Sequence, residues 1–197
     1  MKRRGLLKLG FLAAAAPVIP WAVSPVILFC TTAAAKDKAV QDVGLFKPLI
    51  EALRRTDKPV CKGAANGLAN RRDIDVSYNI HLRNASLTTQ DAGLIATALN
   101  DLHKAAFVRL ESFSVSYNPE MYYTGIKALL DALPNHITEL GLVGCNLDDQ
   151  CANSITAFLE RSHSLTMVCV EENDFSPSVK SAIRNATQHL SGCVTIT

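Results

Sequence analysis

The sequence predicts an α/β fold in which short strands alternate with helices. Two observations lead to this prediction. A strand-like pattern of apolar residues recurs along the chain, and each copy is followed at a fixed distance by a helix-like apolar stripe. Strands that alternate with helices in this way are typical of a parallel sheet covered by helices.

The strand pattern has apolar residues at its first, fourth and sixth positions, and an asparagine or cysteine at its ninth. It covers residues 110–118, 137–145 and 165–173, with a weaker copy at 80–87. Side chains alternate between the two faces of a strand, so the sixth-position residues should point into one interior, beneath one another. These residues lie 33, 27 and 28 positions apart: Leu82, Val115, Leu142 and Val170.

The helix pattern repeats apolar residues at every fourth position, which marks one face of a helix. Residues 87–99 align without a gap on residues 147–159, and Leu, Gln, Ala, Ile and Leu coincide. Residues 121–133 and 175–187 fit the same frame. One such unit cannot bury both its strand and its helix, so the units are expected to stack.

A strand, an asparagine-or-cysteine turn and a full helix in roughly 28 residues resemble the ribonuclease-inhibitor-like leucine-rich repeats. The resemblance covers residues 74–190. The sequence departs from the family at Ala85, which replaces the Asn or Cys, and near Pro119, where one extra residue is present. The resemblance implies a short solenoid, a horseshoe arc with parallel strands on its concave face and helices on its convex face.

Three parts of the chain are therefore expected: an export signal or membrane anchor (1–35), an N-terminal capping helix with a connector (36–73), and a leucine-rich-repeat domain of about four repeats (74–197). The capping helix is expected over residues 46–53. The connector after it, residues 54–73, contains Pro59, Gly63 and Gly67 and is expected to be irregular. Residues 193–197 can add a last strand.

The first 35 residues have the features of an export signal. Residues 3–8, Arg-Arg-Gly-Leu-Leu-Lys, resemble the twin-arginine export motif of bacteria, although Lys2 and Leu6 depart from it. An uncharged run follows from residue 9 to residue 35, ending in small residues that suit cleavage. The run is also long enough for an uncleaved membrane anchor. In both cases the rest of the chain is expected outside the cytoplasm, in the periplasm or the extracellular space.

Charge and motifs exclude several classes of function. The net charge is +2, but the start of the chain supplies four of the 20 basic residues, and the remaining 16 face 18 acidic ones. No basic surface for nucleic acid is therefore expected. The six cysteines have no metal-binding spacing, and the sequence contains no phosphate-binding glycine loop or hydrolase serine motif. We expect no cofactor, no metal and no enzymatic activity.

Side chains between the interior strand positions are expected to face the concave surface. Parallel sheets are usually covered on both faces, so an open one favours the binding of a protein or peptide over a merely solvated surface. Basic groups in the first unit and glutamates in the fourth would orient the partner, and Tyr117 is the expected anchor. The candidate partner-binding residues are His81, Arg83, Ser114, Ser116, Tyr117, Val143, Cys169, Glu171 and Glu172.

The sequence thus predicts a non-enzymatic binding module of an exported bacterial protein. The resemblance implies contact with a host protein, as in secreted effectors of intracellular bacteria. One alternative is a membrane-anchored envelope protein with a structural or assembly role. A less favoured alternative is a small thiol-dependent enzyme, because the expected neighbours of Cys169 are glutamates, which disfavour a thiolate. Cys145 and Cys151 are expected in the turn and in the core, respectively.

Overall fold

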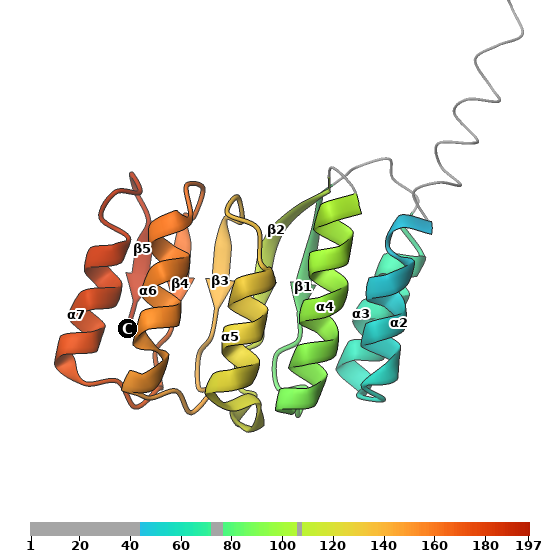
Figure 1. Ribbon diagram of the computed structural model, residues 1–197, viewed down its shortest axis with the longest axis horizontal. Coiled ribbons are helices and arrows are strands. Elements are labelled where there is room, and N and C mark those ends of the chain that lie inside the picture. Colours follow the sequence, from blue (N-terminus) through green and yellow to red (C-terminus); the bar gives the residue numbers. More distant parts are fainter. Residues whose placement is uncertain (1–43, 72–76, 106–107) are drawn as a thin grey trace, which may run out of the picture.

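The computed structural model describes residues 44–71, 77–105 and 108–197 (Figure 1). These parts contain six α-helices: α2 (Lys47–Arg55), α3 (Pro59–Ala69), α4 (Thr89–Ala105), α5 (Tyr122–Ala132), α6 (Ala152–Arg161) and α7 (Pro177–Ala186). Short 3₁₀ helices, η1 (Pro119–Met121) and η2 (Asp149–Cys151), precede α5 and α6. The five strands are β1 (Ser77–His81), β2 (Arg109–Ser114), β3 (Glu139–Gly141), β4 (Met167–Cys169) and β5 (Val194–Ile196). The fold is α/β, as the sequence predicts.

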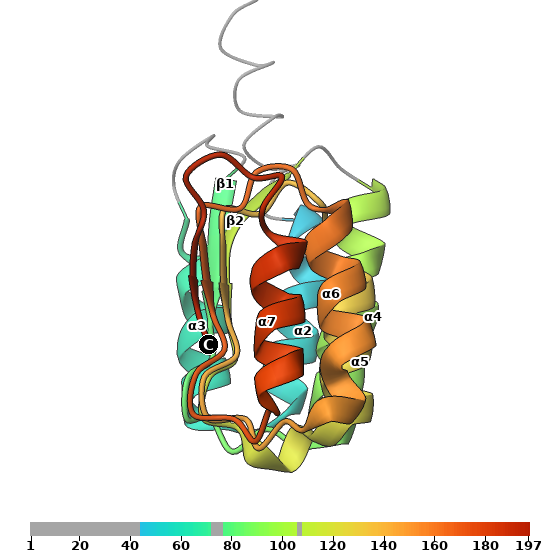
Figure 2. The same ribbon diagram turned by 90° about the vertical axis from the view of Figure 1, so that its left-hand side faces the viewer.

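The five strands form one parallel sheet in chain order, β1-β2-β3-β4-β5. A helix of the series α4 to α7 lies between each strand and the next in the sequence. Figure 2 shows these four helices and α2 in one layer, with the sheet in a second layer beside them. Helix α3 lies next to β1 in the layer of the sheet (Figure 2). The sheet face turned away from the helix layer carries no helix of the described parts, and we call it the open face.

The interior is built from the residues that the strand pattern predicts. Leu82, Val115, Leu142 and Val170 are each at most 1% exposed. A second row, two positions earlier on each strand, is equally buried and in register: Ile80, Phe113, Leu140 and Val168. The helices add their stripes to the same core, including Ile95, Leu129, Ile155 and Ile183. The expectation that successive strands share one interior is confirmed.

Asparagine side chains hold the turns that follow the strands. The Oδ1 atom of Asn118, a fully buried residue, accepts hydrogen bonds from the N–H groups of Ala85 (2.9 Å) and Leu87 (3.0 Å). Its Nδ2 atom donates to the carbonyl oxygens of Leu82 (2.8 Å), Val115 (2.7 Å) and Ser116 (3.2 Å). A buried turn needs such partners because its backbone groups cannot reach water.

Asn173 repeats this arrangement 55 residues later. Its Oδ1 accepts from Cys145 and Leu147, and its Nδ2 donates to Leu142, Val170 and Glu171. In the unit between the two asparagines, the thiol of Cys145 donates to the carbonyl oxygen of Val115. Cys145 therefore occupies the turn position, as predicted.

The segment after α2 differs from the sequence prediction. Residues 54–73 were expected to be irregular, but Pro59–Ala69 form α3. Pro59 suits the first turn of a helix, where its missing N–H costs nothing. Cys61, Ala65 and Leu68 make a helical stripe that is buried. The two glycines of α3 would meet nothing within 4 Å if a Cβ were added, so they lie on its free side.

The structure also tests the elements predicted near the two ends of the chain. The helix expected over residues 46–53 is α2, and the expected last strand is β5. No helix in the described parts is long and apolar enough to cross a membrane. The expected export signal or membrane anchor, residues 1–35, lies outside the described residues, so its assignment stays a prediction.

Candidate functional site

Strand pairing arranges the side chains of the open face in rows across the sheet. One row runs from β1 to β5 through Asn79, Ser112, Glu139, Met167 and Val194. The next row runs through His81, Ser114, Gly141, Cys169 and Ile196. Residues after the strand ends extend the surface toward the turns. The chemistry of this face is thus set by side chains that are about 27 to 33 residues apart in the sequence.

A depression of about 350 Å³ occupies the middle of the open face. Gly141 is one of its lining residues and contributes no side chain. A Cβ added there would stand 2.6 Å from the Ser114 hydroxyl oxygen and 3.2 Å from that of Ser116. The hydroxyl groups of Ser114 and Ser116, 3.2 Å apart, therefore cover Gly141 and form part of the floor of the depression.

A chain of contacts forms the edge of the depression nearest the turns. The guanidinium carbon of Arg83 lies 4.2 Å from the ring centroid of Tyr117, a cation–π geometry. The Tyr117 hydroxyl donates to Glu172 Oε1 at 3.1 Å. The ring lies over Gly144, where an added Cβ would stand 2.9 Å from it. Because Gly144 leaves this space free, Tyr117 of the second unit reaches Glu172 of the fourth.

The carboxylates of the depression form no ion pair with the residues that the structure describes. The ion pairs found in the described residues join Lys47 to Glu51, Lys62 to Asp57 and Lys127 to Asp131, all away from the open face. Glu139 is exposed, whereas Glu171 is half-buried and its Oε2 atom is buried without a hydrogen-bond partner in the described parts. These two glutamates and one arginine, Arg83, line the depression.

The basic groups of the depression are already engaged. Arg83 stacks on Tyr117, and His81 Nε2 is 2.8 Å from the Ser112 hydroxyl. The thiol of Cys169 is neutral near pH 7, because burial raises its pKa and the charges of Glu171 and Glu139 raise it further. A cysteine nucleophile needs the opposite environment, with positive charge nearby.

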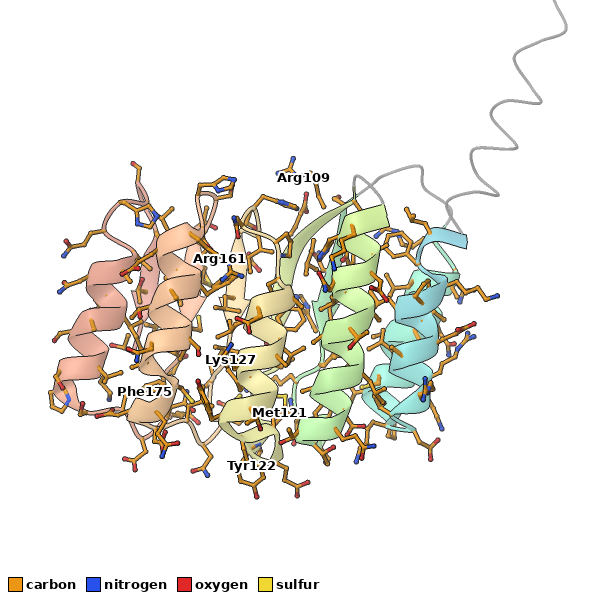
Figure 3. The ribbon with its side chains drawn as sticks, viewed as in Figure 1. Arg109, Met121, Tyr122, Lys127, Arg161 and Phe175 are labelled. Atoms are coloured by element: carbon orange, nitrogen blue, oxygen red, sulfur yellow. The ribbon has the colours of Figure 1, made fainter. Side chains whose placement is uncertain are left out.

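The helix layer differs from the open face in the pairing of its charges. Figure 3 labels Lys127 on α5 and Arg161 on α6. Lys127 pairs with Asp131, four residues further along α5. Arg161 Nη2 donates to the carbonyl oxygens of Leu130 and Leu133 at the end of α5. These charged groups join neighbouring turns and helices, which is a structural role.

The structure brings together the nine residues that the sequence predicts as partner-binding. Seven of the nine line the depression: His81, Arg83, Ser114, Ser116, Val143, Cys169 and Glu171. The other two, Tyr117 and Glu172, form its edge.

Two expectations about these residues need correction. Ser116 and Val143 are only 2% and 7% exposed, because their neighbours in the sheet cover them, so they form the floor rather than a contact surface. Tyr117 is half-buried, with Arg83 over its ring and Gly144 beneath it, and its role as the anchor for a partner stays a prediction.

The candidate partner-binding residues do not include the apolar end of this face. Val194 and Ile196 on β5 are 52% and 44% exposed, and Met167 on β4 is 42% exposed. The strand pattern places Met167 on the open face. The alternation of Val194 and Ile196 around Thr195 is the signal that could have placed these two residues there as well.

The five described cysteines are free thiols. Cys151 lies in the core, as predicted, and burial raises its pKa to about 11. The described residues contain no group of three or more His, Cys, Asp or Glu side chains placed to hold a metal ion.

The chain matches none of the protein-family models with which it was compared, and no curated protein matches it.

Proposed function

We propose that the chain is a leucine-rich-repeat protein of the ribonuclease-inhibitor-like type, and that its open sheet face binds another protein or peptide. In this proposal the sheet is the concave face of a short solenoid. The repeating strand, turn and helix support it, as does the ladder of Asn118, Cys145 and Asn173, which occupies the family's turn position. Stacked units of this kind create extended binding surfaces.

One observation carries the binding role: the open face of a parallel sheet holds a depression lined by unpaired carboxylates. Parallel sheets are normally covered on both faces, so an uncovered face with unsatisfied charge indicates that a partner covers it. The raised pKa of Cys169 weighs against the alternative of a thiol-dependent enzyme.

The proposal includes export by the twin-arginine-like signal over residues 1–35, with a host protein as the partner. Fractionation and mass measurement of the mature N-terminus test this part. A start near Lys36 in released material is expected. Intact residue 1 in the membrane would favour the alternative of an anchored envelope protein.

A photo-crosslinking experiment tests the binding face. A photoreactive amino acid replaces Met167 on the open face or, as a matched control, the exposed Ala157 on α6. Each variant is irradiated with its native surroundings, and the products are identified by mass spectrometry. We expect one partner to be crosslinked from position 167 and not from position 157. Equal yields at both positions would rule out the open face as the binding surface.

A further inference from the structure

The open face has an apolar patch directly beside the acidic depression. Among the described residues, five large apolar side chains are exposed, and three of them lie together in this patch: Met167, Val194 and Ile196. The strand register pairs Met167 with Val194, and Ile196 with Cys169. Met167 and Cys169 also line the depression, so the two regions are continuous.

Each region lacks a different kind of contact. In the depression, the basic groups Arg83 and His81 have partners, whereas Glu139 forms no ion pair in the described chain and Glu171 Oε2 has no hydrogen-bond donor there. The missing contact is therefore a cation. In the patch, the missing contact is an apolar side chain.

We propose that the open face takes a partner segment in which a lysine or arginine stands two residues from an apolar residue. The basic side chain enters the depression above Gly141 and reaches Glu139 and Glu171. Its aliphatic stem lies along Met167 and Cys169. The apolar side chain packs on Met167, Val194 and Ile196. This inference rests on the proposed function and specifies the chemistry of the partner.

The spacing of the strands sets the spacing of the two residues. Neighbouring strands are about 4.8 Å apart. Glu139 lies on β3 and the patch lies between β4 and β5, so the carboxylate and the centre of the patch are about 7 Å apart across the sheet. In an extended segment, residues i and i+2 point to the same side and are about 6.8 Å apart. A segment that crosses the strands therefore places a basic residue in the depression and the second residue after it on the patch.

The test uses the isotopically labelled full-length chain and the peptide acetyl-Arg-Ser-Leu-amide. Binding is followed by NMR through the backbone amides of Gly141, Cys169 and Ile196. Two control peptides replace arginine by the neutral, nearly isosteric citrulline or leucine by serine. We expect saturable shifts with the first peptide and clearly weaker binding of both controls.

Variants of the chain separate charge from shape. The double variant Glu139→Gln, Glu171→Gln keeps the side-chain size, and we expect it to bind the arginine peptide about tenfold more weakly, in line with the loss of two ion pairs. Glu160→Gln removes one charge from α6 in the helix layer and should bind like the wild type. The urea midpoint of each variant checks that it is folded.

Three outcomes would overturn the inference: citrulline binding as well as arginine, the double variant binding as well as the wild type, or shifts centred on α4 to α7. Such a result, together with crosslinking from position 167, would leave the proposed function intact and refute only this choice of partner. If the peptide test fails and position 167 also gives no specific crosslink, the proposed function is refuted as well.

Discussion

The turn ladder allows a quantitative prediction about Asn118. Its side chain is fully buried and makes five hydrogen bonds to the backbone of two successive units. In Asn118→Ala, the N–H groups of Ala85 and Leu87 lose their acceptor, and the carbonyl groups of Leu82 and Val115 lose a donor.

The magnitude follows from the cost of buried groups without partners. Each buried donor or acceptor left unsatisfied costs about 1–3 kcal/mol. The two N–H groups have no second way to bond, whereas each carbonyl oxygen has a second lone pair. We therefore expect a loss of about 3–5 kcal/mol in the free energy of unfolding. That is a large part of the ~5–15 kcal/mol typical of a folded domain.

Asn173 and Cys145 provide matched comparisons at equivalent positions. Asn173 makes the same set of bonds but is half-buried, so water can replace part of what Asn173→Ala removes. We expect a loss of about 1–3 kcal/mol there. Cys145 contributes one weak thiol donor to Val115, and Cys145→Ala should cost ~1 kcal/mol.

Equilibrium urea denaturation of the full-length variants, followed by far-UV circular dichroism, measures this series. The expected order of destabilisation is Asn118, then Asn173, then Cys145. A loss below about 1 kcal/mol for Asn118→Ala would refute the reasoning. So would an equal or larger loss for Asn173→Ala, because burial is the main difference between the two sites.

Three further predictions concern the thiol, a histidine and the edge of the depression. Burial raises the pKa of Cys169, and the charge of Glu171 raises it further. At pH 8, iodoacetamide should therefore modify this thiol more slowly than it modifies free cysteine, and Glu171→Gln should speed up the modification. Peptide mass spectrometry measures both rates. Burial lowers the pKa of His103, so the unfolded chain binds more protons below about pH 6.5. Stability should therefore fall from pH 7 to pH 5, and urea midpoints of His103→Gln should change less over this range. Tyr117→Phe loses one hydrogen bond and should lower the free energy of unfolding by about 0.5–1 kcal/mol. Gly144→Ala places a Cβ against the Tyr117 ring at a φ of 58° and should lower it by more, about 1–3 kcal/mol. Thermal unfolding ranks the two, and the reverse order would contradict the contact between Gly144 and the ring.

The strand and helix positions could be predicted because their signal is local. Leu82, Val115, Leu142 and Val170 are buried as the two-residue alternation requires, and Ile155 is buried as the helix stripe requires. Each of these signals lies within about ten residues, so no knowledge of distant contacts was needed.

Helix α3 shows where a local signal is insufficient. Its proline and two glycines resemble a loop, since glycine costs about 1 kcal/mol in a helix relative to alanine. The helix is instead stabilised by burial of Cys61, Ala65 and Leu68, which is a tertiary effect. Propensity is a weak guide when a short segment gains this much burial.

The composition of the site could be predicted, but its shape could not. Strand alternation identifies which side chains face outward, and seven of the predicted residues line the depression. Whether an outward residue is exposed depends on the residue opposite it on the next strand. Ser116 is buried for this reason, although its position is the same as that of exposed Arg83 one unit earlier. That information is about 27 residues away in the sequence.

Two glycines in the third unit, Gly141 and Gly144, lie beneath side chains of the second unit. Above Gly144 the free space is filled by Tyr117, which makes that glycine part of a fixed edge. At Gly141 the place of a Cβ is taken by Ser114, because an added Cβ would stand 2.6 Å from its hydroxyl oxygen and 3.0 Å from its Cβ. A larger residue at position 141 would thus displace the Ser114 side chain, whereas one at position 144 would displace a ring held by Arg83 and Glu172. Both glycines are therefore required by the packing of the open face itself, because side chains of the second unit occupy the space above each of them.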